Sequence, residues 1–158
     1  MKKIIFILGV FFVLMGPRNA HASDSQEQKN ISRDHIIKSL EDLNKGDVKG
    51  SVLNLEKSID DNPNEAESYL LLSQILLKTK QTEEAASVLG YAAKLFPNNS
   101  TVFYMLGFAE LEEGHKPKAI LAAKRSIELL SEEQPEQIIE ISKSKALKLY
   151  NLIVDSKS

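Results

Sequence analysis

The sequence has 158 residues and contains no cysteine. Without cysteine the chain cannot form a disulfide, a thiolate metal site or a lipidated N-terminal cysteine. It must therefore be held together by packing alone, which stacked helices can achieve.

The sequence also lacks an apolar run long enough to span a bilayer comfortably, which takes about 20 residues. Its longest run is Ile4–Met15, which follows Lys2 and Lys3 and precedes the small-residue segment Ala20-His21-Ala22. A charged start, a short apolar stretch and an Ala-x-Ala end are typical of a secretory signal peptide. We therefore predict that residues 1–22 are a signal peptide cleaved after Ala22, and that the mature protein is periplasmic or secreted. An uncleaved membrane anchor is the alternative, which the shortness of the run disfavours.

No cluster of basic residues follows the signal segment. Removing residues 1–22 removes three basic residues and no acid, so the remaining chain carries 17 basic and 22 acidic residues, a net charge of −5. Nucleic acid and anionic lipid both require a basic face. The charge therefore argues against either as a partner.

Motifs that would carry chemistry are absent as well. The sequence has no Gly-rich phosphate loop and no Gly-x-Ser-x-Gly elbow. His35 and His115 are far apart, and neither belongs to a His-x3-His pattern, so we expect no metal site. Adjacent glutamates, as at Glu112-Glu113, point about 100° apart on a helix and are ordinary solvated charge. We therefore expect no cofactor, no small-molecule substrate and no enzymatic activity.

What the sequence does contain is a repeat. The segment 66–97 holds two apolar helical runs around the polar hinge 78–82, and the same residue types return 34 positions later. Such a period is typical of a stacked helical array. The matching pairs are Tyr69 and Phe103, Leu72 and Leu106, Ser73 and Gly107, Lys80 and Gly114, and Ala85 and Ala119.

The period divides the chain into parts. We predict a disordered leader at 23–31, three repeats at 32–65, 66–99 and 100–133, and a capping helix with a short tail at 134–158. Asp47, Asn99 or Ser100, and Gly114 are expected at helix ends. Ser32 is expected to cap the first helix, and the segment 131–135 to start the last, whose apolar residues include Leu149, Leu152 and Ile153.

The first repeat departs from the pattern. His35 and Lys38 occupy its aromatic and leucine positions, and its apolar stripe moves onto Ile37 and Leu40. Either this helix is rotated or its turn is two residues shorter.

These residues resemble the tetratricopeptide repeat, in which an aromatic residue, Leu-Gly, Ala-x3-Phe and Pro recur. The second copy has Tyr69, Leu72-Ser73, Ala85 and Pro97, and the third has Phe103, Leu106-Gly107 and Ala119. The resemblance implies an all-α, right-handed superhelix of three helix-turn-helix repeats closed by a C-terminal helix. The small residues at 73, 85, 107 and 119 are expected where two helix backbones approach closely.

A second apolar stripe lies on the first helix of each repeat. Its members are Leu70, Gln74, Leu77, Tyr104, Phe108 and Leu111. In the family that it resembles, this stripe faces a concave groove that holds partner peptides. Alternatively, these residues contact only the neighbouring repeat or the capping helix.

The stripe carries no Lys, Arg or Asn, so the dicarboxylate clamp of some family members is absent. An apolar groove favours an apolar or amphipathic segment. We therefore expect a non-catalytic adaptor that binds such a segment of a protein partner in the bacterial cell envelope, as an assembly or scaffolding factor. The alternative is a structural protomer that uses the same stripe to form a homo-oligomer.

Overall fold

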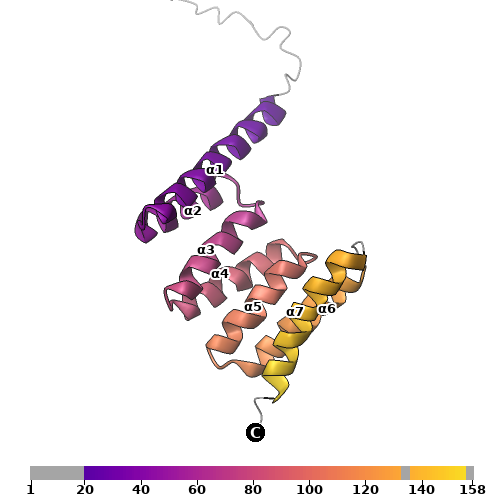
Figure 1. The fold of residues 1–158 in the computed structure, drawn as a ribbon. Helices are drawn as coiled ribbons and strands as arrows, with labels where there is room; N and C mark the ends of the chain where they lie inside the picture. The colour runs from indigo at the N-terminus through magenta and orange to yellow at the C-terminus, as the bar shows by residue number, and fades with distance from the viewer. Residues whose placement is uncertain (1–19, 133–135, 156–158) are drawn as a thin grey trace, which may run out of the picture.

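The computed structural model describes residues 20–132 and 136–155. Within these residues the chain forms seven helices and no strand, so the predicted all-α architecture of helical hairpins with a closing helix is confirmed (Figure 1). The helices are α1 (Ala20–Asn44), α2 (Val48–Asp61), α3 (Ala66–Lys78), α4 (Thr82–Leu95), α5 (Ser100–Glu112), α6 (Lys116–Glu132) and α7 (Glu136–Asp155).

The turn inside each hairpin recurs every 34 residues. Gly46, Lys80 and Gly114 have positive φ values of 81°, 65° and 76°. In each case the second helix of the hairpin starts two residues later. A left-handed backbone costs a residue with a Cβ about 1–2 kcal/mol, so Lys80 is held there by the packing of the hairpin. The turn of the first repeat has the same length as the others, so the suggestion that it is two residues shorter is wrong.

Two of the predicted capping residues, Asp47 and Asn99, behave as expected. Asp47 accepts a hydrogen bond from the backbone N–H of Gly50 at 2.8 Å and caps α2. Asn99 accepts from the N–H groups of Thr101 and Val102 and caps α5.

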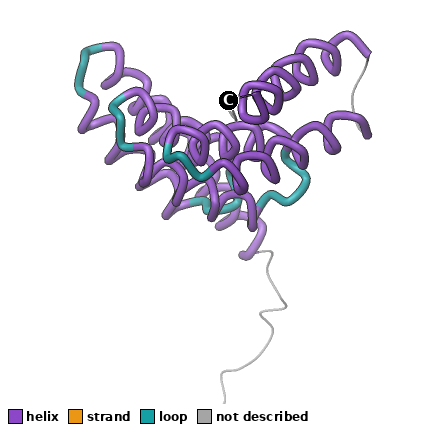
Figure 2. The backbone as a smooth tube through the Cα atoms, turned by 90° about the horizontal axis from the view of Figure 1, so that it is seen from below, coloured by secondary structure: helices purple, strands orange, loops and turns teal. Residues whose placement is uncertain are grey.

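One apolar core runs through the first five helices. Its buried members are Ile36, Leu55, Leu72, Ile75, Leu76, Ala85, Leu89, Met105 and Ala109. A second cluster joins α6 to α7 and contains Ala119, Ala123, Leu149 and Ile153. The hairpins lie one beside the next along the chain, and α7 lies against the last of them (Figures 1 and 2).

The helices of a hairpin approach closely at the predicted small residues. Ser73, Ala85 and Ala119 are fully buried. A Cβ added to Gly107 would lie 3.3 Å from both the carbonyl oxygen of Ala119 and the backbone nitrogen of Ala123. Glycine at this position therefore lets α5 approach the backbone of α6.

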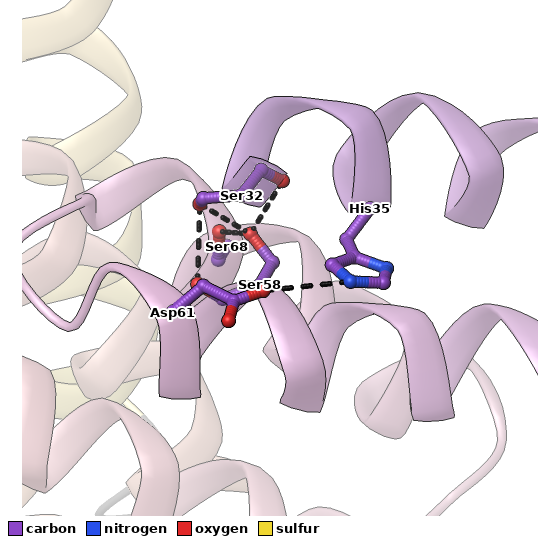
Figure 3. A network of polar contacts seen from close by, with 5 residues as sticks. All are labelled: Ser32, His35, Ser58, Asp61 and Ser68. Atoms are coloured by element: carbon purple, nitrogen blue, oxygen red, sulfur yellow. Dashed lines mark hydrogen bonds and ion pairs between the residues drawn. The ribbon is translucent and has the colours of Figure 1, made fainter. Parts of the chain in front are cut away.

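Helices α1 and α2 meet through serines rather than leucines. The hydroxyl oxygens of Ser32 and Ser58 lie 2.8 Å apart, and those of Ser39 and Ser51 lie 2.7 Å apart. The Ser58 hydroxyl also lies 2.8 Å from that of Ser68 in α3 (Figure 3). All five side chains are buried, so their hydroxyl groups are satisfied inside the protein. This network connects the first three helices.

Two predictions for the N-terminal part are wrong. Residues 23–31 are not a disordered leader, because α1 begins at Ala20 and includes them. Ser32 is not an N-cap, because it lies buried inside α1. The segment 26–29 consists of Gln, Glu and Lys, which are good helix formers, and a helix already nucleated by packing extends at low cost.

The predicted apolar stripe of the first repeat is also wrong. Ile37 is 56% exposed and Leu40 is 43% exposed, whereas Ser32, Ile36 and Ser39 face the core. Small serines at this spacing allow the close packing of α1 on α2, so α1 keeps the register of the later repeats.

At the other end, two details differ from expectation. Helix α6 continues through Glu132, so the last helix does not start at Ser131. Leu152 is 60% exposed, because Leu149 and Ile153, four residues apart, form the stripe that α7 buries and Leu152 lies about 100° away from Ile153.

The first helices of the hairpins lie closer together than the second helices. Helix α3 contacts α5 and α5 contacts α7, whereas no two of α2, α4 and α6 make more than a marginal contact among the described residues. The array therefore curves toward its first helices. We call the exposed side of α1, α3 and α5 the inner face.

Candidate functional site

The six residues predicted to bind a partner differ in their exposure to solvent. Leu70 and Leu77 are half-buried against the main core. Tyr104 is half-buried and packs against both the main core and the second cluster, and Leu111 packs against the second cluster. Gln74 is exposed, and Phe108 is 37% exposed. Packing within the chain thus accounts for much of four of these side chains and leaves the other two open.

A third exposed residue joins these two. Leu40 lies 34 positions before Gln74, and Gln74 lies 34 positions before Phe108, so the three share one register on α1, α3 and α5. Their place in the repeat sets them on the inner face, one from each hairpin. We call Leu40, Gln74 and Phe108 the inner ridge.

The inner ridge stands above a half-buried apolar floor. The floor consists of Leu43, Leu70, Leu77, Tyr104 and Leu111, one turn before or after the ridge residues. The Gln74 amide lies 4.0 Å from the sulfur of Met105, which fixes its position toward α5. The inner ridge therefore offers a leucine, an amide and a phenylalanine to a partner, above a continuous apolar surface.

Sequence reasoning missed Leu40. It placed Leu40 in the core because Ile37 and Leu40 were interpreted as the displaced apolar stripe of the first repeat. The signal that could have found it is the 34-residue register, which aligns Leu40 with Gln74.

The third hairpin contains an acidic group that sequence reasoning also passed over. Glu110 is 9% exposed and stands 34 positions after Leu76 of the main core. Its carboxylate lies 2.8 Å from Nδ1 of His115 and 3.7 Å from Nζ of Lys118. These contacts join the end of α5 to the start of α6, which gives Glu110 a structural role.

Figure 3 brings together serine, histidine and aspartate side chains, which invites comparison with a hydrolytic triad. Nε2 of His35 lies 3.4 Å from Asp61, but no hydrogen bond joins His35 to a serine among the described residues. Ser58 is fully buried and donates to the carbonyl oxygen of Ser32. A nucleophile must be within hydrogen-bond reach of its base and open to substrate, so this cluster has the geometry of a packing network.

Within the part of the chain that the structure describes, neither a metal site nor a membrane-spanning helix is present. No three His, Asp or Glu side chains there come close enough to hold a metal ion together. None of the described helices combines the length and the apolar character needed to cross a membrane.

The comparison with known families now adds to this geometry. The family model of the tetratricopeptide repeat matches residues 54–86, from the second helix of one hairpin into that of the next. Over these residues the chain is similar to the tetratricopeptide-repeat family. The predicted superhelix of such repeats is thereby confirmed, and its inner face is the side on which the ridge lies.

Several solved structures share the fold. The first tetratricopeptide-repeat domain of Spaghetti (RPAP3), bound to an HSP90 peptide, superposes with a TM-score of 0.67 at 14% identity over 81% of this chain and 94% of that one. PcrH, in complex with the chaperone-binding region of PopD, gives 0.69 at 14% identity over 80% and 92%. The Yersinia enterocolitica type III secretion chaperone SycD, in complex with a peptide of the translocator YopD, gives 0.69 at 15% identity over 89% and 100%. At these identities the likeness shows the fold alone. No curated protein sequence is significantly similar to the chain.

Proposed function

We propose that this protein is a non-catalytic adaptor of the bacterial cell envelope that binds an apolar or amphipathic segment of a partner protein on its inner face. The observation that carries the proposal is the inner ridge, because it exposes Leu40 and Phe108 at equivalent positions of separate repeats. Three structures of the same fold were solved with a bound peptide or binding region of another protein, which supports a protein ligand.

The exposed surface of Leu40 and Phe108 limits the free energy that these side chains can contribute to binding. Burying a whole Leu or Phe side chain contributes about 1.5–3 kcal/mol, and Phe108 and Leu40 still expose 37% and 43% of their surface. Covering them therefore supplies roughly 1 kcal/mol each, before the cost of ordering the partner segment. Micromolar binding requires about 8 kcal/mol, so these two contacts add selectivity while the rest of the partner segment must supply most of the affinity.

The location in the envelope rests on the sequence of residues 1–22, of which the first 19 lie outside the described residues. A lysine-flanked apolar run with an Ala-x-Ala end supports export and cleavage after Ala22. N-terminal sequencing of the mature protein tests this part, since an intact Met1 would contradict it.

Site-specific crosslinking in cells tests the adaptor. A photo-crosslinking amino acid at Gln74 should form a discrete adduct with an envelope protein, and Phe108→Ala and Leu40→Ala should each reduce its yield. The matched control is Leu121→Ala in α6, which removes a leucine that is 68% exposed outside the inner face. Equal loss with Leu121→Ala would show that any exposed leucine suffices and would sink the proposal.

The same experiment separates the adaptor from a self-associating protomer. The homo-oligomer hypothesis predicts an adduct between two copies of the chain. It also predicts a dimer in light scattering that Phe108→Ala converts to a monomer. These two results together would refute the adaptor hypothesis.

A further inference from the structure

We propose that a pocket at the end of the inner face, between α5, α6 and α7, binds the side-chain carboxylate of an acidic residue in the partner segment. This inference rests on the proposed function and specifies the chemistry of the partner. The pocket has a volume of about 190 Å³ and is lined by Ser100, Thr101, Tyr104, Ser126, Leu130 and Lys145.

The lining provides hydrogen-bond donors without protein partners. The hydroxyl groups of Ser100, Thr101 and Tyr104 make no hydrogen bond to any described group, whereas Ser126 donates to the carbonyl oxygen of Ser100 at 2.8 Å. The N–H groups of Thr101 and Val102 in the first turn of α5 are not available, because Asn99 already accepts from them. The pocket therefore offers side-chain hydroxyl donors rather than a bare helix end.

The only charge on the described lining is positive. Lys145 forms no ion pair with a described acidic side chain, and the described residues that line the pocket include no acid. Lys118, by contrast, lies 3.7 Å from Glu110, and Lys80 lies 3.8 Å from Glu112. A lysine and three hydroxyl groups without a hydrogen bond to a described residue, all on one pocket lining, match the acceptor oxygens of a carboxylate.

The pocket is continuous with the inner face through Tyr104. Tyr104 and Phe108 are four residues apart on α5, so their Cβ atoms lie about 5–6 Å apart on one side of the helix. A segment that places an apolar side chain on Phe108 can therefore place its next contact at Tyr104.

The size of the pocket favours a side-chain carboxylate over a bare anion. Its volume of about 190 Å³ is many times the roughly 10–15 Å³ that holds a single water, so it accommodates more than a bare carboxylate. Leu130 and the Tyr104 ring provide apolar surface for the methylene groups of a glutamate, while Lys145 and Thr101 bind its oxygens.

The test uses small probes, so that it does not depend on the partner. The chain from Ser23, labelled with nitrogen-15, is titrated to millimolar concentration with N-acetyl-Leu-Glu amide, which carries a side-chain carboxylate, and with its Leu-Gln analogue, which is neutral. We expect saturable shifts of the Thr101 and Tyr104 amide signals with the glutamate probe, and at least about threefold weaker binding of the glutamine probe.

Lys145→Gln should lower the affinity for the glutamate probe to the affinity that the unmodified protein has for the glutamine probe. The matched control is Lys148→Gln, which removes an equally exposed lysine one turn further along α7 and should leave both affinities unchanged. Equal binding of the two probes by the unmodified protein, no binding at these residues, or an equal loss in both lysine variants would overturn the inference. Tighter binding of N-acetylleucine, which carries an α-carboxylate, would show that a chain end is the true ligand and would refute the side-chain assignment. None of these outcomes bears on the crosslink from Gln74, so the inference can fail while the proposed function stands.

Discussion

The buried serine network predicts an unusual stability response at Ser58. Ser58 contacts Ser32 in α1 and Ser68 in α3, and all three side chains are fully buried. Among the described residues, the Ser68 hydroxyl has only the Ser58 hydroxyl as a hydrogen-bond partner, whereas Ser32 also donates to the Ser58 carbonyl oxygen at 3.1 Å. Ser58→Ala therefore strands one buried hydroxyl, that of Ser68.

The expected cost follows from these contacts. A net hydrogen bond contributes about 1 kcal/mol, and an unsatisfied buried hydroxyl costs about 1–3 kcal/mol. Alanine regains roughly 0.5 kcal/mol through its higher helix propensity. Ser58→Ala should therefore lower the free energy of unfolding by about 2 kcal/mol. Ser68→Ala should cost at most about 1 kcal/mol, because Ser58 still donates to the Ser32 carbonyl oxygen.

The double variant with alanine at both 58 and 68 distinguishes a hydrogen-bond network from simple packing. With alanine already at position 58, Ser68→Ala removes the stranded hydroxyl and should be neutral or stabilising. The two substitutions should thus be non-additive by about 1 kcal/mol or more. Urea unfolding of the four proteins at one pH measures this, with an unchanged dependence of the free energy on urea as the sign of a clean comparison.

An exposed serine in α4 provides the control. Ser87→Ala on the exposed side of α4 should change the stability by less than about 0.5 kcal/mol. If Ser58→Ala costs no more than Ser87→Ala, or if the effects at 58 and 68 add, the network contributes nothing beyond its packing volume.

Three further predictions concern single sites. Gly107→Ala should destabilise the protein despite the better helix propensity of alanine, because its Cβ would press on the backbone of α6; a rise in melting temperature would contradict this. Asp47→Ala should cost about 1 kcal/mol in urea unfolding while Asp47→Asn costs little, since Asn caps equally well; equal losses would refute the cap. Burial, together with the charges of Tyr91 and Asp60, raises the pKa of Tyr69 above 10.0, so its contribution is complete below pH 10 and is lost as the pH rises through the folded value. Thermal unfolding across this range should therefore show a steeper alkaline decline in the native protein than in Tyr69→Phe, and parallel curves would exclude the effect.

Features of the fold that depend on near neighbours could be predicted from the sequence. The 34-residue spacing, the cap at Asp47 and the left-handed Gly114 are all determined within a turn or two of the chain. The burial of Ser32 could not be predicted in this way, because it depends on Ser58, which lies 26 residues away. A serine without a hydrogen-bond partner costs free energy to bury, and local reasoning therefore predicted Ser32 as the N-cap of the first helix.

The candidate site shows the same limit. The register correctly grouped Gln74 and Phe108 on one side of the array, but the cover over Tyr104 and Leu111 comes from α7, whose packing depends on tertiary contacts. Leu40, by contrast, was predicted to be buried but is exposed. Serines rather than leucines pack this part of α1 against α2.

The openness of the inner ridge is a consequence of how each hairpin closes. Each ridge residue directly follows the small residue through which its helix packs on its partner: Ser39 precedes Leu40, Ser73 precedes Gln74 and Gly107 precedes Phe108. Adjacent residues point about 100° apart on a helix, so a small residue aimed at the partner helix turns its successor away from it. Because the small residue already brings the backbones into contact, the hairpin does not need the next side chain for packing. The ridge residues are therefore free to differ between repeats, as leucine, glutamine and phenylalanine do, while the small residues are confined to serine and glycine by the space between the helices.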